Sequence, residues 1–234
     1  MKPIKLFAAA LALLCCGLSA AAQDNEIFPD MPDHNVALQQ VIKEWHTLGF
    51  YSAGWDKQPT VRNYFVGLAE SYPNDLFQMI VAKMVGLDVD DALWNYVLDV
   101  ANGFVSGELG TETTPSVQMC YWRCGDGSRL VAVALQGSEY SEEEPDPSWT
   151  DEEIDDHIFV KLNDIAFFRI LGDESLMRPL PVRKVCGREV KFQEYDKIEL
   201  PRQGKDIHLI TFDEEGEEHV TTLKWNGNGF TVAR

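Results

Sequence analysis

This sequence is poor in basic residues and lacks the short motifs that mark common enzyme active sites. Neither a Gly-x-Ser-x-Gly nucleophile turn, a His-Glu-x-x-His zinc motif nor a Gly-rich phosphate loop occurs in its 234 residues. Lysine and arginine number 20 against 38 aspartates and glutamates, so the formal net charge is −18. This sign disfavours binding to nucleic acids and to anionic lipids. Basic proteins, cations and neutral ligands such as glycans stay open as partners.

Apolar runs long enough to span a membrane are also absent, and the longest apolar run lies at the N-terminus. Lys2 and Lys5 precede an apolar segment at 6–20, which leads into the small residues Ala20-Ala21-Ala22 before Gln23. This order is typical of an export signal with its cleavage site. About fifteen apolar residues are too few to span a bilayer, which needs roughly twenty. We therefore expect residues 1–22 to be a signal peptide and the mature chain to be periplasmic or extracellular, without a membrane span.

Cysteine is scarce, which excludes a disulfide scaffold. Cys15 and Cys16 lie in the signal, and the leucine before Cys15 makes a lipoprotein anchor the less favoured alternative. Cys120 and Cys124 lie on one expected strand, roughly 13 Å apart and beyond the bridging limit of about 7 Å. Cys186 could pair with either. No paired cysteine or histidine spacing indicates zinc, so we expect free or structural cysteines and no cofactor.

Hydrophobic periodicity changes from helical to alternating at about Leu93. Helices are predicted over 33–48, 61–70 and 74–85, with Asn74 as an N-cap. Further along, turn residues predict hairpins at Asn102-Gly103 (type I′), Gly125-Asp126-Gly127, Asn163-Asp164 and Glu215-Gly216, before a last strand at 230–233. The expected class is α+β: a signal at 1–22, a helical segment at 23–92 and an antiparallel β-rich meander of sequential hairpins at 93–234, in one domain or two.

An acidic segment interrupts the β-rich body. Residues 138–156 hold ten acids among nineteen residues, together with Pro145 and Pro147. This composition predicts a solvated loop. Its carboxylates could also contact a partner or bind a cation, but they lack the spacing of a calcium-binding loop. A metal site is therefore left open.

The five histidines show no catalytic or metal-binding spacing. A turn at Glu215-Gly216 would set His219 opposite Phe212 and His208 opposite Leu223, on one face but roughly 13 Å apart. They could not share a metal ion. The only conceivable nucleophile is Cys186 with a histidine from elsewhere in the chain. No catalytic residue is assigned.

Two tryptophans are the candidate ligand-binding residues. Trp55 and Trp149 fall in expected loops, where an exposed ring could stack on a sugar or anchor a protein partner. The other four tryptophans lie on expected helices or strands and are predicted to be core residues: Trp45, Trp94, Trp122 and Trp225.

Several strings together resemble a group of secreted proteins of unknown function from gut Bacteroidetes. They are SAAAQ at the signal end, NGF at 102–104, CYWRCGDGSRLVAV at 120–133, LPRQGKDI at 200–207 and LKWNGNGF at 223–230. The resemblance covers roughly residues 95–234. It implies an envelope or secreted location and carries over no catalytic residue.

These observations favour an exported non-enzymatic module that binds a protein or a glycan. Two alternatives stay open. One is a hydrolase whose site is assembled from distant residues. The other is an acidic inhibitor of a basic enzyme, whose binding would weaken with salt because exposed charges are screened over about 8 Å at physiological ionic strength.

Overall fold

The computed structural model describes residues 35–54, 59–111, 113–140, 159–171 and 175–233. The expected signal at 1–22 and the candidates Trp55 and Trp149 lie outside these ranges. The described chain from Val36 onward belongs to one compact unit. It has few helices, the three longest of which precede the second strand, and mostly antiparallel strands, so the expected α+β class is confirmed.

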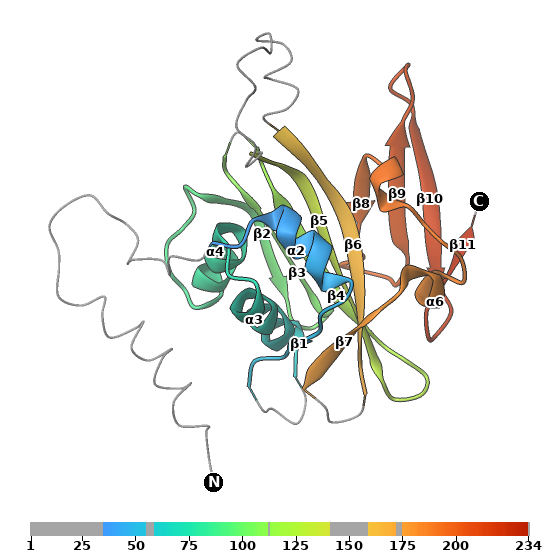
Figure 1. Ribbon diagram of the computed structural model, residues 1–234, viewed down its shortest axis with the longest axis horizontal. Helices are drawn as coiled ribbons and strands as arrows, with labels where there is room; N and C mark the ends of the chain where they lie inside the picture. Colours follow the sequence, from blue (N-terminus) through green and yellow to red (C-terminus); the bar gives the residue numbers. More distant parts are fainter. Residues whose placement is uncertain (1–34, 55–58, 112, 141–158, 172–174, 234) are drawn as a thin grey trace, which may run out of the picture. The chain divides into compact units, whose positions relative to one another are not determined.

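The larger of two sheets is built mainly as a meander. Its strand order is β1-β7-β6-β5-β4-β3-β2, and all its pairs are antiparallel. The bounds are β1 Phe50–Tyr51, β2 Leu93–Asp99, β3 Phe104–Leu109, β4 Ser116–Arg123, β5 Arg129–Tyr140, β6 Phe159–Ile170 and β7 Leu176–Leu180. Strands β2 to β6 follow the chain in order, while β1 and β7 complete the opposite edge (Figure 1).

The C-terminal part forms a smaller sheet of order β11-β10-β9-β8. Its bounds are β8 Lys197–Glu199, β9 Ile207–Phe212, β10 Glu218–Trp225 and β11 Phe230–Ala233. The helices are α2 Leu38–Trp45, α3 Val61–Ser71, α4 Asp75–Met84 and α6 Val182–Cys186, with a 3₁₀ turn η2 at Phe192–Glu194. The first helix is shorter than predicted, whereas α3 and α4 agree with the sequence to within about two residues.

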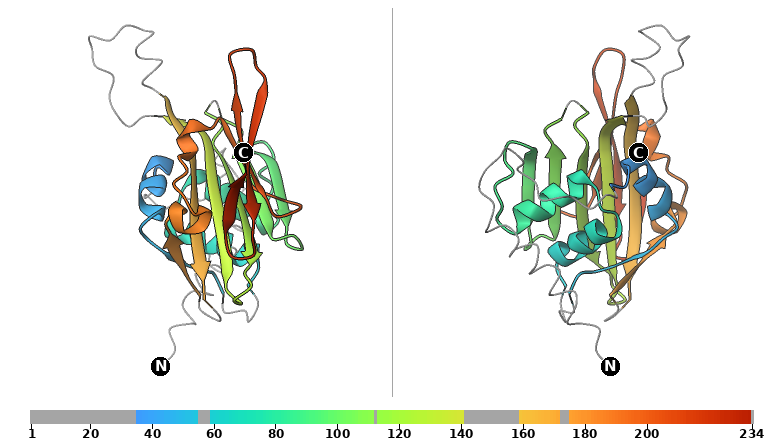
Figure 2. Two further views of the ribbon diagram at one scale, coloured as in Figure 1. Left: turned by 90° about the vertical axis from the view of Figure 1, so that its right-hand side faces the viewer. Right: turned by 60° about the vertical axis from the view of Figure 1, so that its left-hand side comes forward.

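The large sheet is covered on both faces. Helices α2, α3 and α4 pack on one face, and the small sheet packs on the other (Figures 1 and 2). Strand β5 shows the consequence, because its residues alternate between two cores. Val131, Val133 and Leu135 belong to the helical core, and Leu130, Ala132 and Ala134 belong to the core shared with the small sheet. A continuous apolar run is what such a doubly buried strand requires.

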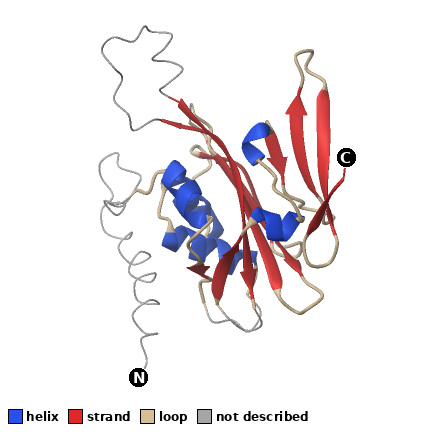
Figure 3. Ribbon diagram, turned by 45° about the vertical axis from the view of Figure 1, so that its right-hand side comes forward, coloured by secondary structure: helices blue, strands red, loops and turns tan. Residues whose placement is uncertain are grey.

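Local capping explains where the helices begin. The Asn74 side chain accepts a hydrogen bond from the Phe77 amide at 3.0 Å, as the sequence predicts for the N-cap of α4. Thr60 and Asn63 form a reciprocal capping box at the start of α3. Figure 3 shows these helices gathered on one side of the large sheet.

The predicted hairpin at Asn163-Asp164 is wrong. Both residues lie inside the continuous strand β6, where each is only 4% exposed. Their polar side chains are buried because partners from other elements satisfy them: backbone carbonyls bind Asn163, and side-chain donors bind Asp164. A buried, hydrogen-bonded Asn-Asp pair looks like a turn signal in sequence.

Two other predicted turns are present with a different geometry. The β2–β3 loop has four residues, and of these only Gly103 has a positive φ, so it is not a type I′ turn. The β9–β10 loop has five residues and pairs Phe212 with Glu218. This one-residue change places His219 opposite Thr211 and His208 opposite Thr222, so the two histidines project from opposite faces of the sheet.

Three amide side chains dock the small sheet onto the large one. Gln118, Gln136 and Asn163 project from neighbouring strands β4, β5 and β6, and we call them the amide row. Gln136 accepts the Ile198 amide at 2.7 Å and donates to the Ile198 carbonyl at 2.8 Å. Gln118 accepts the Leu200 amide at 2.9 Å. β8 is the edge strand of its sheet, so one side of it has no neighbouring strand. The amide row satisfies backbone groups on that open side.

Asn163 extends the amide row beyond β8. It lies directly opposite Gln136 and donates to the carbonyls of Phe192 and Tyr195 around η2. The segment from η2 through β8 is therefore held on the large sheet by side chains, whereas the strand ladder of β8 is formed with β9. Its position on the large sheet depends on these three residues.

We predict that Gln136→Ala lowers the free energy of unfolding by about 1–3 kcal/mol, because it leaves the Ile198 amide without a partner and the Ile198 carbonyl with only the longer bond from Gln118, at 3.3 Å. Urea unfolding measures this change. Gln203→Ala, at an exposed loop position, is the matched control and should change stability by less than about 0.5 kcal/mol. Equal effects of the two substitutions would contradict the docking role.

Candidate functional site

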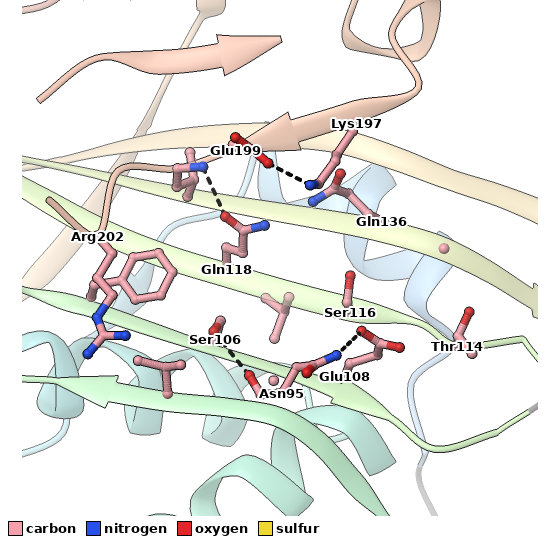
Figure 4. Close-up of a pocket in the computed structure, with 16 residues that line it drawn as sticks. Asn95, Ser106, Glu108, Thr114, Ser116, Gln118, Gln136, Lys197, Glu199 and Arg202 are labelled. Carbon is pink, nitrogen blue, oxygen red and sulfur yellow. Dashed lines mark hydrogen bonds and ion pairs between the residues drawn. The ribbon is translucent and has the colours of Figure 1, made fainter. Parts of the chain in front are cut away.

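A groove of about 540 Å³ lies where the two sheets diverge. Its floor is the outer face of β2, β3, β4 and β5, and its wall is β8 with the segment that follows, up to Arg202 (Figure 4). One end carries the apolar side chains of Val97, Phe104 and Leu200. The rest is lined by hydroxyl, amide and charged groups. This volume falls within the range of small-ligand sites, about 300–1,000 Å³.

Hydrogen-bonding groups line the polar part of the groove. Ser106 and Ser116 project into it from β3 and β4, beside the amide row residues Gln118 and Gln136 (Figure 4). The Asn95 amide donates to a Glu108 carboxylate oxygen at 3.1 Å. Each of these groups retains donor or acceptor capacity beyond its observed bonds. A ligand rich in hydroxyl or amide groups could therefore be held here.

Backbone strain is concentrated at the groove. Among the described residues, Asn95 and Thr114 are the only non-glycine residues with positive φ, at 50° and 42°, and both line the groove. A β-branched residue such as threonine rarely adopts this conformation. Gly137, which lines the groove as well, lies so close to the Thr114 carbonyl that a Cβ there would be 2.5 Å from it. Strained residues of this kind gather at functional sites.

The basic side chains of the groove are paired with carboxylates. Lys197 lies 2.5 Å from Glu199, and Arg202 lies 3.2 Å from Asp99, whose side chain is next to the groove. Hydrogen bonds from the side chain and backbone of Asn102, with a further one from Arg202, lower the pKa of Asp99. Acids and bases nearly balance within the groove. It is therefore suited to an uncharged ligand.

The tryptophans do not all lie where the sequence predicts. Trp45 and Trp122 are buried, and Trp225 is partly buried against Trp122, at a ring-centroid distance of 5.6 Å. The prediction that Trp94 is a core residue is wrong, because 47% of it is exposed. Strand β2 is the edge of its sheet, so no further strand lies beside this ring.

A buried carboxylate with three donors lies on the helical face of the large sheet, away from the groove. Asp164 accepts hydrogen bonds from the Trp45 indole at 3.2 Å and from Gln193 at 3.4 Å, and it pairs with His46 at 2.5 Å. Within the described residues, no serine, threonine or cysteine side chain hydrogen-bonds to His46. The arrangement fastens the end of α2 to β6 and offers no nucleophile.

The remaining described histidines are also bound locally. His219 pairs with Asp213 at 3.0 Å, and this contact is the main cause of the lowered pKa of Asp213. His208 lies 3.3 Å from the Thr222 hydroxyl. The described part of the chain holds no group of three or more His, Cys, Asp or Glu side chains that could bind a metal ion. Most of the acidic segment at 138–156 lies outside the described residues.

All three cysteines after the signal are buried and free. Cys186 does not pair with Cys120 or Cys124. Burial raises the pKa of Cys120 well above its ordinary value and that of Cys186 to about 12. The nucleophile considered from the sequence, Cys186, is therefore a protonated core thiol at neutral pH.

Comparison with known protein families, curated proteins and solved structures finds no match for this chain. Among the described helices, none has the length and apolar character needed to cross a bilayer. The assignment of the groove as the candidate site therefore rests on its geometry. Sequence reasoning missed it because its residues come from five strands and were individually unremarkable. Gly137, which lies inside strand β5 and lines the groove, was the available signal.

We predict that iodoacetamide does not modify Cys120 or Cys186 in the native protein at pH 8. A thiol of pKa about 12 is ionised to the extent of only about one part in ten thousand at that pH. Peptide mass spectrometry locates the modified sites, and unfolded protein, in which all three thiols react, is the control. Rapid native modification of Cys186 would instead favour a catalytic thiol.

We predict that Asp164→Ala lowers the free energy of unfolding by about 2–4 kcal/mol, because three donors lose a buried acceptor. Urea unfolding gives the value. Asp91→Ala, at an exposed position, should change it by less than about 0.5 kcal/mol. A small effect of Asp164→Ala on stability would argue that the pair with His46 serves something other than packing of α2.

Proposed function

We propose that this protein is an exported, non-enzymatic binding module whose ligand occupies the groove between the sheets. The main support for the proposal is that the strained backbone positions of the described chain lie in the lining of this groove. Asn95 and Thr114 both line this groove, and they alone among the described non-glycine residues have positive φ. Such a conformation costs of order 1–3 kcal/mol, which suggests that it serves to shape a site.

The charge pattern supports a neutral, polar ligand. Lys197 and Arg202 already have carboxylate partners, so no described groove cation awaits an anion. The overall charge of −18 would further repel an anionic ligand. Hydroxyl and amide groups on the floor can instead exchange hydrogen bonds with an uncharged ligand.

The described residues give little support to the hydrolase alternative. Cys186 is buried with a raised pKa, and the Asp164–His46 pair lies on the face opposite the groove. The expected signal at 1–22 would deliver the module to the periplasm or the outside of the cell. Its ligands would then be those of the envelope or the surrounding medium.

Filling the groove tests this proposal. The panel is a set of neutral oligosaccharides and a set of peptides, screened at millimolar concentration by ligand-detected NMR. We predict that Ser116→Phe and Ser106→Phe abolish binding of the ligand that the wild type takes, because both side chains would occupy the groove. Ser71→Phe, at an exposed position of α3 on the opposite face, makes the same substitution and should leave binding intact.

Two results would contradict the proposal: no ligand from either set, or a ligand bound equally by all four proteins. Binding of a basic protein that disappears at moderate salt and ignores both groove substitutions would favour the acidic-inhibitor alternative.

A further inference from the structure

An exposed tryptophan lies beside the groove on the same face as its polar residues. Trp94 is directly paired with Glu108 across β2 and β3, and paired residues project to the same face of a sheet. Glu108 lines the groove. Trp94 is therefore at the edge of the cavity, with about half of its surface open to solvent.

A glycine holds this ring in place. If residue 110 had a Cβ, that atom would lie 2.6–2.9 Å from Cε2, Nε1 and Cζ2 of Trp94. Only glycine leaves room for the indole to rest against the backbone there. One side of the ring is thus supported by the main chain, and the ring loses little further freedom when a ligand stacks on it.

A bulge in β2 brings a polar pair next to the ring. The pairing with β3 shifts between Trp94 and Val97, and Asn95 has φ 50°. In a regular strand, residues 94 and 95 would point to opposite faces. The bulge lets Asn95 line the groove beside Glu108, which accepts its amide hydrogen bond.

From this juxtaposition we infer that the groove binds a neutral saccharide, with Trp94 stacking on a sugar ring and Asn95 and Glu108 binding its hydroxyl groups. A pyranose presents C–H bonds on one face, which pack on an aromatic ring, and hydroxyls at its edge, which both donate and accept. The inference rests on the proposed function, because it names the ligand class of the same groove.

A peptide fits this site less well. Peptides commonly bind by adding a strand to an exposed sheet edge. Along the groove, the outer backbone groups of β8 are taken by Gln118 and Gln136, and β2 is interrupted by its bulge. A bulged edge resists strand addition. The saccharide is therefore favoured over the peptide.

The test measures affinity for neutral oligosaccharides of glucose, mannose, galactose and N-acetylglucosamine by titration calorimetry. We expect Trp94→Ala to weaken binding about tenfold or more, which corresponds to about 1.4 kcal/mol. Trp94→Phe keeps a flat ring and should retain most of the affinity. Phe212→Ala removes an equally exposed aromatic side chain on the small sheet and should change nothing. Neutral-sugar binding should also be insensitive to salt.

A second variant keeps the test decisive if Trp94→Ala fails to fold. Asn95→Gly removes the amide while allowing the positive φ, and we expect a several-fold loss of saccharide affinity. Saccharide binding unchanged in both variants would overturn the inference. If only peptides bind, and groove substitutions at Ser106 and Ser116 abolish that binding, the saccharide inference fails while the proposed function stands. If nothing binds in the groove, both fail.

Discussion

The interaction on which the rest of this structure depends is the docking of an edge strand by side-chain amides. Gln118, Gln136 and Asn163 present planar donor and acceptor groups to the backbone between η2 and Leu200. They do for β8 what a neighbouring strand would do, without a strand's regular spacing. The small sheet packs closely on the large one over their shared core and diverges from it at the groove, where no strand ladder joins the two layers.

The groove is the space left by that divergence. The floor of the groove can be polar because it is open to solvent. Beyond the amide row, Trp122, Trp225 and Phe230 fill the space between the sheets with an aromatic core. The same sheet face thus changes from buried core to open groove along its length. On the opposite face the helices complete a second core, where Asp164 fastens α2. The two polar residues of β6 face different layers. Asn163 donates to a carbonyl of η2 on the side of the small sheet, and Asp164 accepts from Trp45 of α2 on the side of the helices.

The structural features that the sequence predicts correctly are those that depend on residues close together in the chain. Asn74 capped α4 as expected, and the change of period near Leu93 marked the start of the strands, because caps and alternation depend on neighbouring residues. Asn163 and Asp164 were misread as a turn, since their partners lie at Phe192 and Trp45. Trp94 was predicted to be core because a strand's edge position is decided by the sheet order. The groove could not be predicted from the sequence, because it depends both on contacts between distant residues and on the order of the strands in the sheet.

We infer that the amide row positions a saccharide site where the two sheets diverge. Chemical-shift mapping by two-dimensional ¹⁵N NMR, with a bound neutral oligosaccharide, tests it most directly, because side-chain amides and indole N–H groups are observed individually. The largest changes are expected at the indole of Trp94 and at the side-chain amides of Asn95, Gln118 and Gln136. Largest changes at Trp45 and His46, with the groove unaffected, would contradict it.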